Sequence, residues 1–115
     1  MNLIKEKSNA FALEIVNCYK ILTLEKKEYV MSKQMLKSGT AIGALYREAE
    51  HAESKADFIH KMSIAQKEAN ETLYWLDLLN ISGFLDNDQY ETLKNENISL
   101  RKIISSIILT TKSRR

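Results

Sequence analysis

The sequence predicts an all-α protein, an antiparallel up-down-up-down four-helix bundle, on three observations. Among 115 residues there are no prolines and only three glycines, and a chain poor in these residues makes few turns. Apolar residues recur at alternating steps of four and three in four segments, which is the spacing of amphipathic helices. The connections between the segments are short, so sequential helices must run antiparallel. We expect a single domain over residues 1–115 with helices over about 4–23, 30–50, 54–81 and 87–111.

The first two predicted helices are defined by their apolar stripes. Phe11, Ile15, Cys18 and Leu22 share one face of the first helix, and the charged run LEKKEY then interrupts the pattern. The spacing of four and three residues places such side chains on one side of a helix. The second helix carries its stripe at Met31, Met35, Ser38, Ile42, Leu45 and Ala49.

The third and fourth predicted helices also carry terminal signals. Ser54 is a good N-cap with Asp57 three residues later, and Gly83 can take the left-handed conformation that ends a helix. Asp86 or Asn87 can cap the fourth helix. The seam of the third helix is Phe58, Met62, Ala65, Ala69, Thr72, Leu76 and Leu79. The apolar face of the fourth is Leu93, Leu100, Ile103, Ile104, Ile107 and Ile108.

Two features predict that the bundle associates with copies of itself. Leu73, Trp75 and Leu78 lie off the seam of the third helix, and a helix that is apolar beyond one stripe needs a second partner surface. Gly39 and Gly43 stand one turn apart inside the second helix, where each glycine costs about 1 kcal/mol relative to alanine. Small residues allow another backbone to approach, so we assign these five residues to an oligomer interface. The alternative for the glycines is close packing inside one bundle.

The charge pattern offers two candidate nucleic-acid surfaces. The formal net charge is only +2, so the overall balance does not indicate a nucleic-acid binder. Lys33, Lys37 and Arg47 nevertheless fall on one face of the second helix, with the reach to follow a phosphate backbone. Arg101 and Lys102 begin a second basic cluster near the end of the chain. For both clusters the alternative is a solvated helix face.

Catalytic chemistry finds little support in the sequence. Di-iron bundles use a Glu-x-x-His spacing, and two pairs approach it here, Glu48 with His51 and Asp57 with His60. Both pairs flank the same connection, however, and the carboxylates Glu14 and Glu96 of the other two helices are not level with it. Cys18 has no histidine nearby in the sequence to act as its base. We therefore expect no enzyme, cofactor, metal or small-molecule substrate, with a metal-dependent bundle enzyme as a remote alternative.

The cysteine count and the hydropathy of the sequence indicate the cellular compartment in which the protein is expected. The single cysteine excludes an intramolecular disulfide and suits a reducing compartment. The opening stretch MNLIKEKSNAFALEIV lacks the apolar run of a signal peptide. No segment approaches the ~20 apolar residues of a membrane span. We expect a cytoplasmic protein with no membrane partner.

Two stretches resemble a known family. SKQMLKSGTAIGA, followed by SKADFIHKMSIAQKEANETLYWLDLL, is similar to the patterns SGTSIGAN and SKADFIHKLSIALKEARETRYWL of the bacterial ribosomal-RNA intervening-sequence proteins. The resemblance covers both central helices and most of the chain. It implies a four-helix bundle assembled into a homopentamer. Some members are encoded inside large-subunit ribosomal RNA genes, and a related group serves as accessory proteins to the reverse transcriptase of diversity-generating retroelements.

The chain departs from this family pattern at several positions. Leu45 replaces the family asparagine, and Asn70, Leu73 and Asp77 stand where arginine is frequent, whereas Lys37 keeps a basic position. The resemblance implies RNA, DNA or a reverse transcriptase as partner. These replacements remove part of the basic surface on which such binding would rely. A self-assembling protein-interaction scaffold without nucleic-acid binding is therefore the main alternative.

Overall fold

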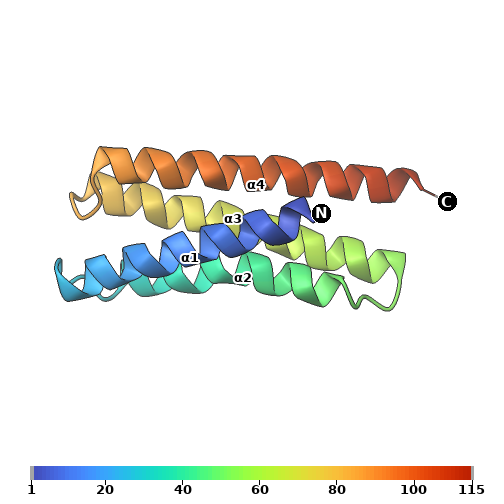
Figure 1. Ribbon diagram of the computed structural model, residues 1–115, viewed down its shortest axis with the longest axis horizontal. Helices are drawn as coiled ribbons and strands as arrows, with labels where there is room; N and C mark the ends of the chain where they lie inside the picture. The colour runs from blue at the N-terminus through green and yellow to red at the C-terminus, as the bar shows by residue number, and fades with distance from the viewer. Residues whose placement is uncertain (1, 115) are drawn as a thin grey trace.

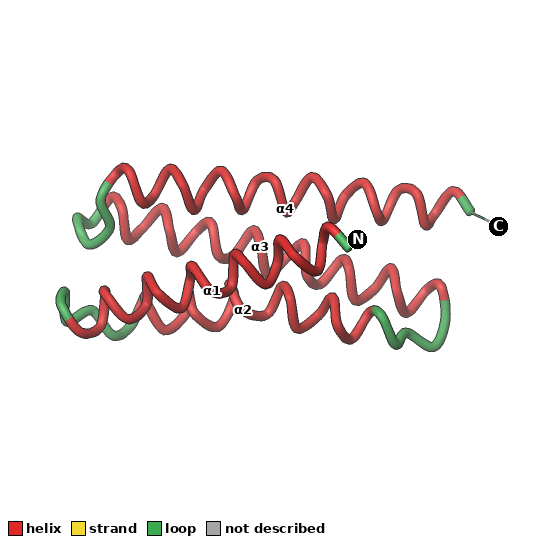
Figure 2. The backbone as a smooth tube through the Cα atoms, in the orientation of Figure 1, coloured by secondary structure: helices red, strands yellow, loops and turns green. Residues whose placement is uncertain are grey.

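Each of the four apolar segments forms a helix in the computed structural model, which describes residues 2–114. The helices are α1 (Leu3–Leu24), α2 (Met31–Ala49), α3 (Lys55–Ile81) and α4 (Asn87–Ser113). Short loops join them, and each helix runs antiparallel to the one before it (Figures 1 and 2). The all-α four-helix bundle predicted from the sequence is confirmed. None of these helices combines the length and apolar character needed to cross a membrane.

The ends of three helices follow the expected capping chemistry. The Ser54 hydroxyl accepts a hydrogen bond from the backbone N–H of Asp57 at 3.0 Å, and the Asp86 carboxylate accepts one from Gln89 at 2.8 Å. The side chain of Asn2 caps α1 in the same way. Gly83, which follows the C-cap residue Ser82 of α3, has φ +85°, a conformation that residues with a Cβ disfavour. The predicted roles of Ser54 at the start of the third helix and of Gly83 after its end are therefore confirmed.

The start of α2 is organised differently, by the side chain of Glu28. Its carboxylate accepts hydrogen bonds from the backbone N–H groups of Val30, Met31 and Ser32 at 3.1, 3.0 and 2.7 Å. Burial favours the neutral acid, but these hydrogen bonds favour the carboxylate more and lower the pKa of Glu28. The charged stretch before α2, which interrupts the apolar pattern, thus contains the group that satisfies the first N–H donors of the helix.

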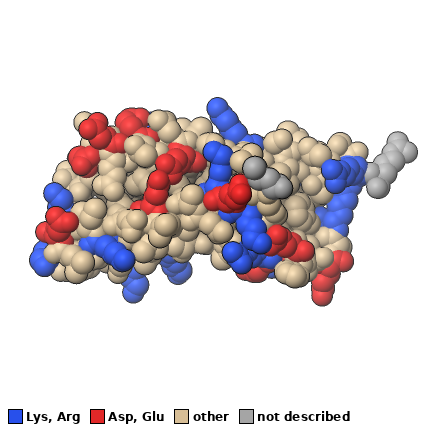
Figure 3. Space-filling model, in the orientation of Figure 1, with Lys and Arg blue, Asp and Glu red and all other residues tan. Residues whose placement is uncertain are grey.

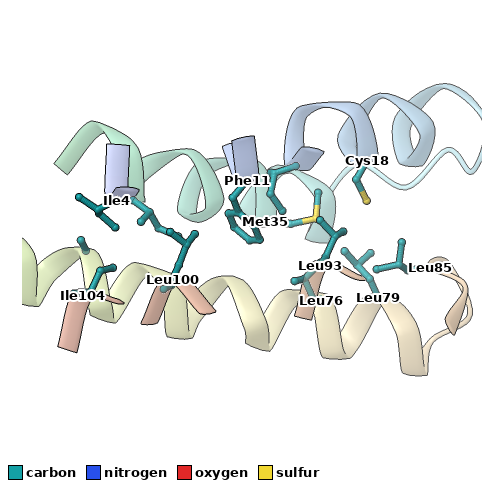
Figure 4. Close-up of a cluster of buried hydrophobic side chains, with 14 of the residues drawn as sticks. Ile4, Phe11, Cys18, Met35, Leu76, Leu79, Leu85, Leu93, Leu100 and Ile104 are labelled. Carbon is teal, nitrogen blue, oxygen red and sulfur yellow. The ribbon is translucent and has the colours of Figure 1, made fainter. Parts of the chain in front are cut away.

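The four helices form a ring in which each touches its two neighbours. Among residues 2–114 the backbones of α1 and α2, α2 and α3, α3 and α4, and α4 and α1 approach each other closely, whereas those of the diagonal pairs do not. The predicted apolar stripes fill the space between them (Figure 4). The side chains of Phe11, Met35, Leu76 and Leu100, one from each helix, are at most 1% exposed. The contact between α1 and α4 is the least extensive of the four.

A few polar side chains are buried within this apolar core. Thr72 Oγ1 of α3 lies 2.9 Å from Ser38 Oγ of α2, in a hydrogen bond between the two helices. Asn97 of α4 donates from Nδ2 to the carbonyl oxygen of Ala69 at 2.9 Å, while its Oδ1 is buried without a partner. Asn97 occupies a seam position between Leu93 and Leu100.

Candidate nucleic-acid and assembly surfaces

The predicted basic stripe lies on the solvent side of α2. The opposite side of this helix is buried, which leaves Lys33, Lys37 and Arg47 exposed. Fourteen residues of helix separate Lys33 from Arg47, or about 21 Å at the α-helical rise. That length matches about six base steps along the axis of duplex DNA. We call these three residues the α2 basic stripe.

The second basic cluster lies on the opposite corner of the bundle. Arg101, half-buried, and Lys102, exposed, sit on α4 beside a groove of about 580 Å³ that also includes Gln66 of α3. Because α2 and α4 are diagonal in the ring, this cluster and the α2 basic stripe do not form one continuous surface. The two basic clusters predicted from the sequence are therefore two separate candidate surfaces.

Acidic and basic side chains are distributed unevenly over the surface. Acidic side chains gather over the end of the bundle where α3 connects to α4, and basic ones project from the part of the α1–α2 edge nearest the loop that joins these helices, while both kinds are mixed over the rest of the visible face (Figure 3). Within residues 2–114, the ion pairs join Lys5 to Glu50 at 3.9 Å and Lys61 to Glu48 at 3.1 Å. The α2 basic stripe takes part in neither, so its charges face solvent without an acidic partner in the described chain.

Gly39 and Gly43 have a different role from the one assigned to them. Both are buried on the side of α2 that faces α1 of the same chain. A Cβ built on Gly39 would lie 3.0 Å from two side-chain carbons of Ile15, and one on Gly43 would lie 3.4 Å from Ser8 Oγ. The close approach that the glycines permit is between α1 and α2, so their assignment to an oligomer interface is wrong. Close packing inside one bundle accounts for them.

The three α3 residues assigned to the interface lie in different surroundings. Trp75 packs partly against the core of its own chain, and its indole N–H donates to Glu71 at 3.1 Å. Its ring also makes an edge contact with Tyr74, at 4.9 Å between centroids. Leu73 and Leu78 are half-buried. These side chains are only partly available to a second copy.

Larger exposed apolar surfaces lie on two other faces. On α1, Leu13, Ile21 and Leu24 are 62%, 40% and 70% exposed, and their spacing of eight and three residues places them on one side. On α3, Tyr74 and Ile81 are 54% and 80% exposed. Leu78 lies between them at steps of four and three, so the three share one side. We call these the α1 apolar face and the α3 apolar face. From the sequence, Leu78 is assigned to the interface but the other five residues of these faces are not, although the same helical spacing places them together.

Metal-ligating and nucleophilic side chains are the other candidates for a site. Within residues 2–114 no three His, Cys, Asp or Glu side chains converge as metal ligands. Cys18 is fully buried, and burial together with the negative charge of Asp86 raises the pKa of its thiol to about 11, which keeps it protonated at neutral pH. Glu14 and Glu96, which the sequence suggested only as distant carboxylates, line one groove between α1 and α4.

A known protein family and a solved structure share the sequence features of this bundle. The family model described as "23S rRNA-intervening sequence protein" matches residues 2–106. The chain belongs to this family. A solved structure of a protein of unknown function from the S23 ribosomal protein family of Bacteroides thetaiotaomicron VPI-5482 is 55% identical, with a TM-score of 0.92. That match covers 93% of this chain and 96% of the other. No curated protein matches the chain.

Membership of the 23S rRNA-intervening sequence protein family confirms the resemblance drawn from the two central helices. The match extends beyond them, from the residue that caps α1 to within α4. It therefore includes the α2 basic stripe, both apolar faces and the residues Arg101 and Lys102.

Proposed function

We propose that this 23S rRNA-intervening sequence protein is a non-enzymatic homo-oligomer, a pentamer, that binds nucleic acid through the α2 basic stripe. In this role it acts by itself or as an accessory to a nucleic-acid enzyme such as a reverse transcriptase. The observation that carries the proposal is the row of three exposed cations on one side of α2, none of which pairs with an acidic side chain among residues 2–114. Phosphate binding by such a row does not depend on base sequence.

The positions of the apolar faces support assembly. A closed ring of identical copies uses two different surfaces on each copy, because each contact is head-to-tail. The α1 apolar face and the α3 apolar face lie on diagonal helices of the ring, and α2 packs against both of these helices. If they form the contacts, every copy of the α2 basic stripe faces the same side of the ring. Linked copies gain from effective concentration, so that few cations per chain are sufficient for binding.

Nucleic-acid binding is tested by titrating RNA and double-stranded DNA at low and at physiological salt. We expect saturable binding of both at low salt, with little preference for sequence and a steep loss of affinity as salt rises, because counterion release dominates. Absence of saturable binding even at low salt would reject the nucleic-acid part of the proposal.

Assembly is tested by light scattering in moderate salt. We expect a mass about five times the 13.3 kDa of the chain. Replacing Leu13 and Leu24 together by Gln should lower this mass, because polar side chains remove the gain from burying apolar area. Leu109→Gln is the matched control, since Leu109 is 68% exposed on α4, away from both faces. A monomer at micromolar concentration, or an equal effect of the control, would contradict the proposed interface.

The exposed apolar faces also favour a second candidate function, a self-assembling protein-interaction scaffold that binds no nucleic acid. A scaffold of this kind would show the same oligomeric mass and no binding in the titration. The two experiments together therefore separate the candidates.

A further inference from the structure

Two carboxyl groups meet where α1 closes the bundle against α4. Glu14 of α1 and Glu96 of α4 are half-buried and line a groove of about 370 Å³, together with Lys7, Asn95 and Ser99. One oxygen of Glu14, Oε2, is buried and has no hydrogen-bond partner in the described chain. We call Glu14 and Glu96 the carboxyl pair.

The chemistry of the carboxyl pair depends on a proton. A carboxylate oxygen can only accept a hydrogen bond, so two ionised groups repel each other and leave acceptors unsatisfied. Once one group takes up a proton, it can donate to the other. The surroundings favour this proton: burial, a hydrogen bond to Glu14 and its negative charge raise the pKa of Glu96 to about 7, although Lys7 acts in the opposite direction.

Few other charges act on the carboxyl pair. Lys7 of α1 is the cation that lines the groove of the carboxyl pair. Glu14 also lines a second groove, and Asp88 of α4 is the other acidic residue there. Neither α2 nor α3 contributes a residue to the lining of either groove. The contact between α1 and α4 is also the least extensive of the four helix contacts. A change in the repulsion between Glu14 and Glu96 therefore acts on the least extensive of the helix contacts, the one between α1 and α4.

We propose that the carboxyl pair is a pH-sensitive contact that holds α1 against α4 while the groups share a proton and loosens this contact once both are ionised. The direction follows from linkage. A carboxyl whose pKa is higher in the folded than in the unfolded chain contributes stability at low pH, and this contribution is lost as the pH rises through the folded value. For Glu96 this stability is lost as the pH rises from about 4.5 to about 7.

The test compares urea unfolding of the full chain with that of Glu96→Gln from pH 5 to pH 8.5, at one protein concentration. The amide of Gln can donate to Glu14 at every pH, so the variant should be the more stable protein at pH 8. Relative to the variant, the folding equilibrium constant of the natural chain should fall by up to about tenfold per pH unit below pH 7, the limit for release of one proton. Glu91→Gln, at an exposed position of the same helix, should follow the natural chain.

A second readout locates the effect in the structure. Amide hydrogen exchange, corrected for its intrinsic pH dependence, should show α1 losing protection above pH 7 in the natural chain and keeping it in Glu96→Gln. The carboxyl carbon of Glu96 should titrate near pH 7 by NMR. Parallel stability profiles of the natural chain and Glu96→Gln, or a titration of Glu96 at its ordinary value, would overturn the proposal.

Discussion

Replacing Lys33, Lys37 and Arg47 together by Gln should sharply weaken the saturable nucleic-acid binding expected at low salt and reduce its dependence on salt. Each phosphate contact contributes about 0.9 to the slope of log affinity against log salt for duplex DNA, so the three lost contacts should flatten that slope by up to about 2.7 for each protomer that contacts the DNA. The loss should be the same for every sequence tested, because phosphates carry no sequence information. The measurement is a binding titration at several salt concentrations.

The control must remove the same charge from elsewhere on the bundle. Lys20 of α1 and Lys55 and Lys67 of α3 are exposed and lie outside both basic clusters, and replacing all three by Gln changes the net charge by the same amount. If this control weakens binding as much as the α2 variant does, the effect comes from overall charge and the α2 basic stripe is only a solvated face. The folded state of both variants is checked by circular dichroism.

Gly39→Leu should destabilise the protomer by about 1–3 kcal/mol or more, the usual range for forcing extra carbons into a packed core. The first carbon of any side chain at this position would already press on Ile15, which is fully buried. Gly43→Ala is the contrasting variant, since its Cβ would make an ordinary contact with Ser8. It should instead gain up to about 1 kcal/mol from helix propensity. Both free energies are measured by urea unfolding.

A double-mutant cycle shows whether Ile15 is the cause. Ile15→Ala alone should cost about 2–5 kcal/mol, but combined with Gly39→Leu it opens room for the new side chain. The double variant should therefore lose less stability than the sum of the two single variants. Additive losses would mean that the glycine does not act through the contact between α1 and α2, and would reopen its assignment to a partner surface.

The local features of the fold were predictable because they depend on neighbours in the sequence. The expected first helix, 4–23, is observed as Leu3–Leu24, and the expected third, 54–81, as Lys55–Ile81. Caps at Ser54 and Asp86 depend on residues three positions away, which a sequence displays directly.

The features that were missed depend on which helix faces which. The partner of Gly39 is Ile15, on another helix, and Glu14 meets Glu96 across most of the chain length. A small residue in a helix predicts that another backbone packs closely against it, but it does not indicate which one. The sequence therefore could not distinguish a second copy of the protein from a neighbouring helix of the same chain. The two basic clusters were likewise visible in the sequence, but their separation on opposite corners follows only from the ring order of the helices.

The buried amide of Asn97 has a consequence for how the helices slide past one another. A seam that repeats every seven residues offers α4 several alignments against α3 that bury similar apolar area. Only in the observed alignment does Asn97 reach the carbonyl of Ala69, and the bond between Thr72 and Ser38 constrains α3 against α2 in the same way. A shift by one heptad would separate the hydroxyls of Thr72 and Ser38 and place Asn97 beside Met62 or Leu76, whose side chains are larger than that of Ala69 and leave less room for a buried amide. These polar side chains thus reduce the apolar content of the core while selecting one vertical alignment of three helices.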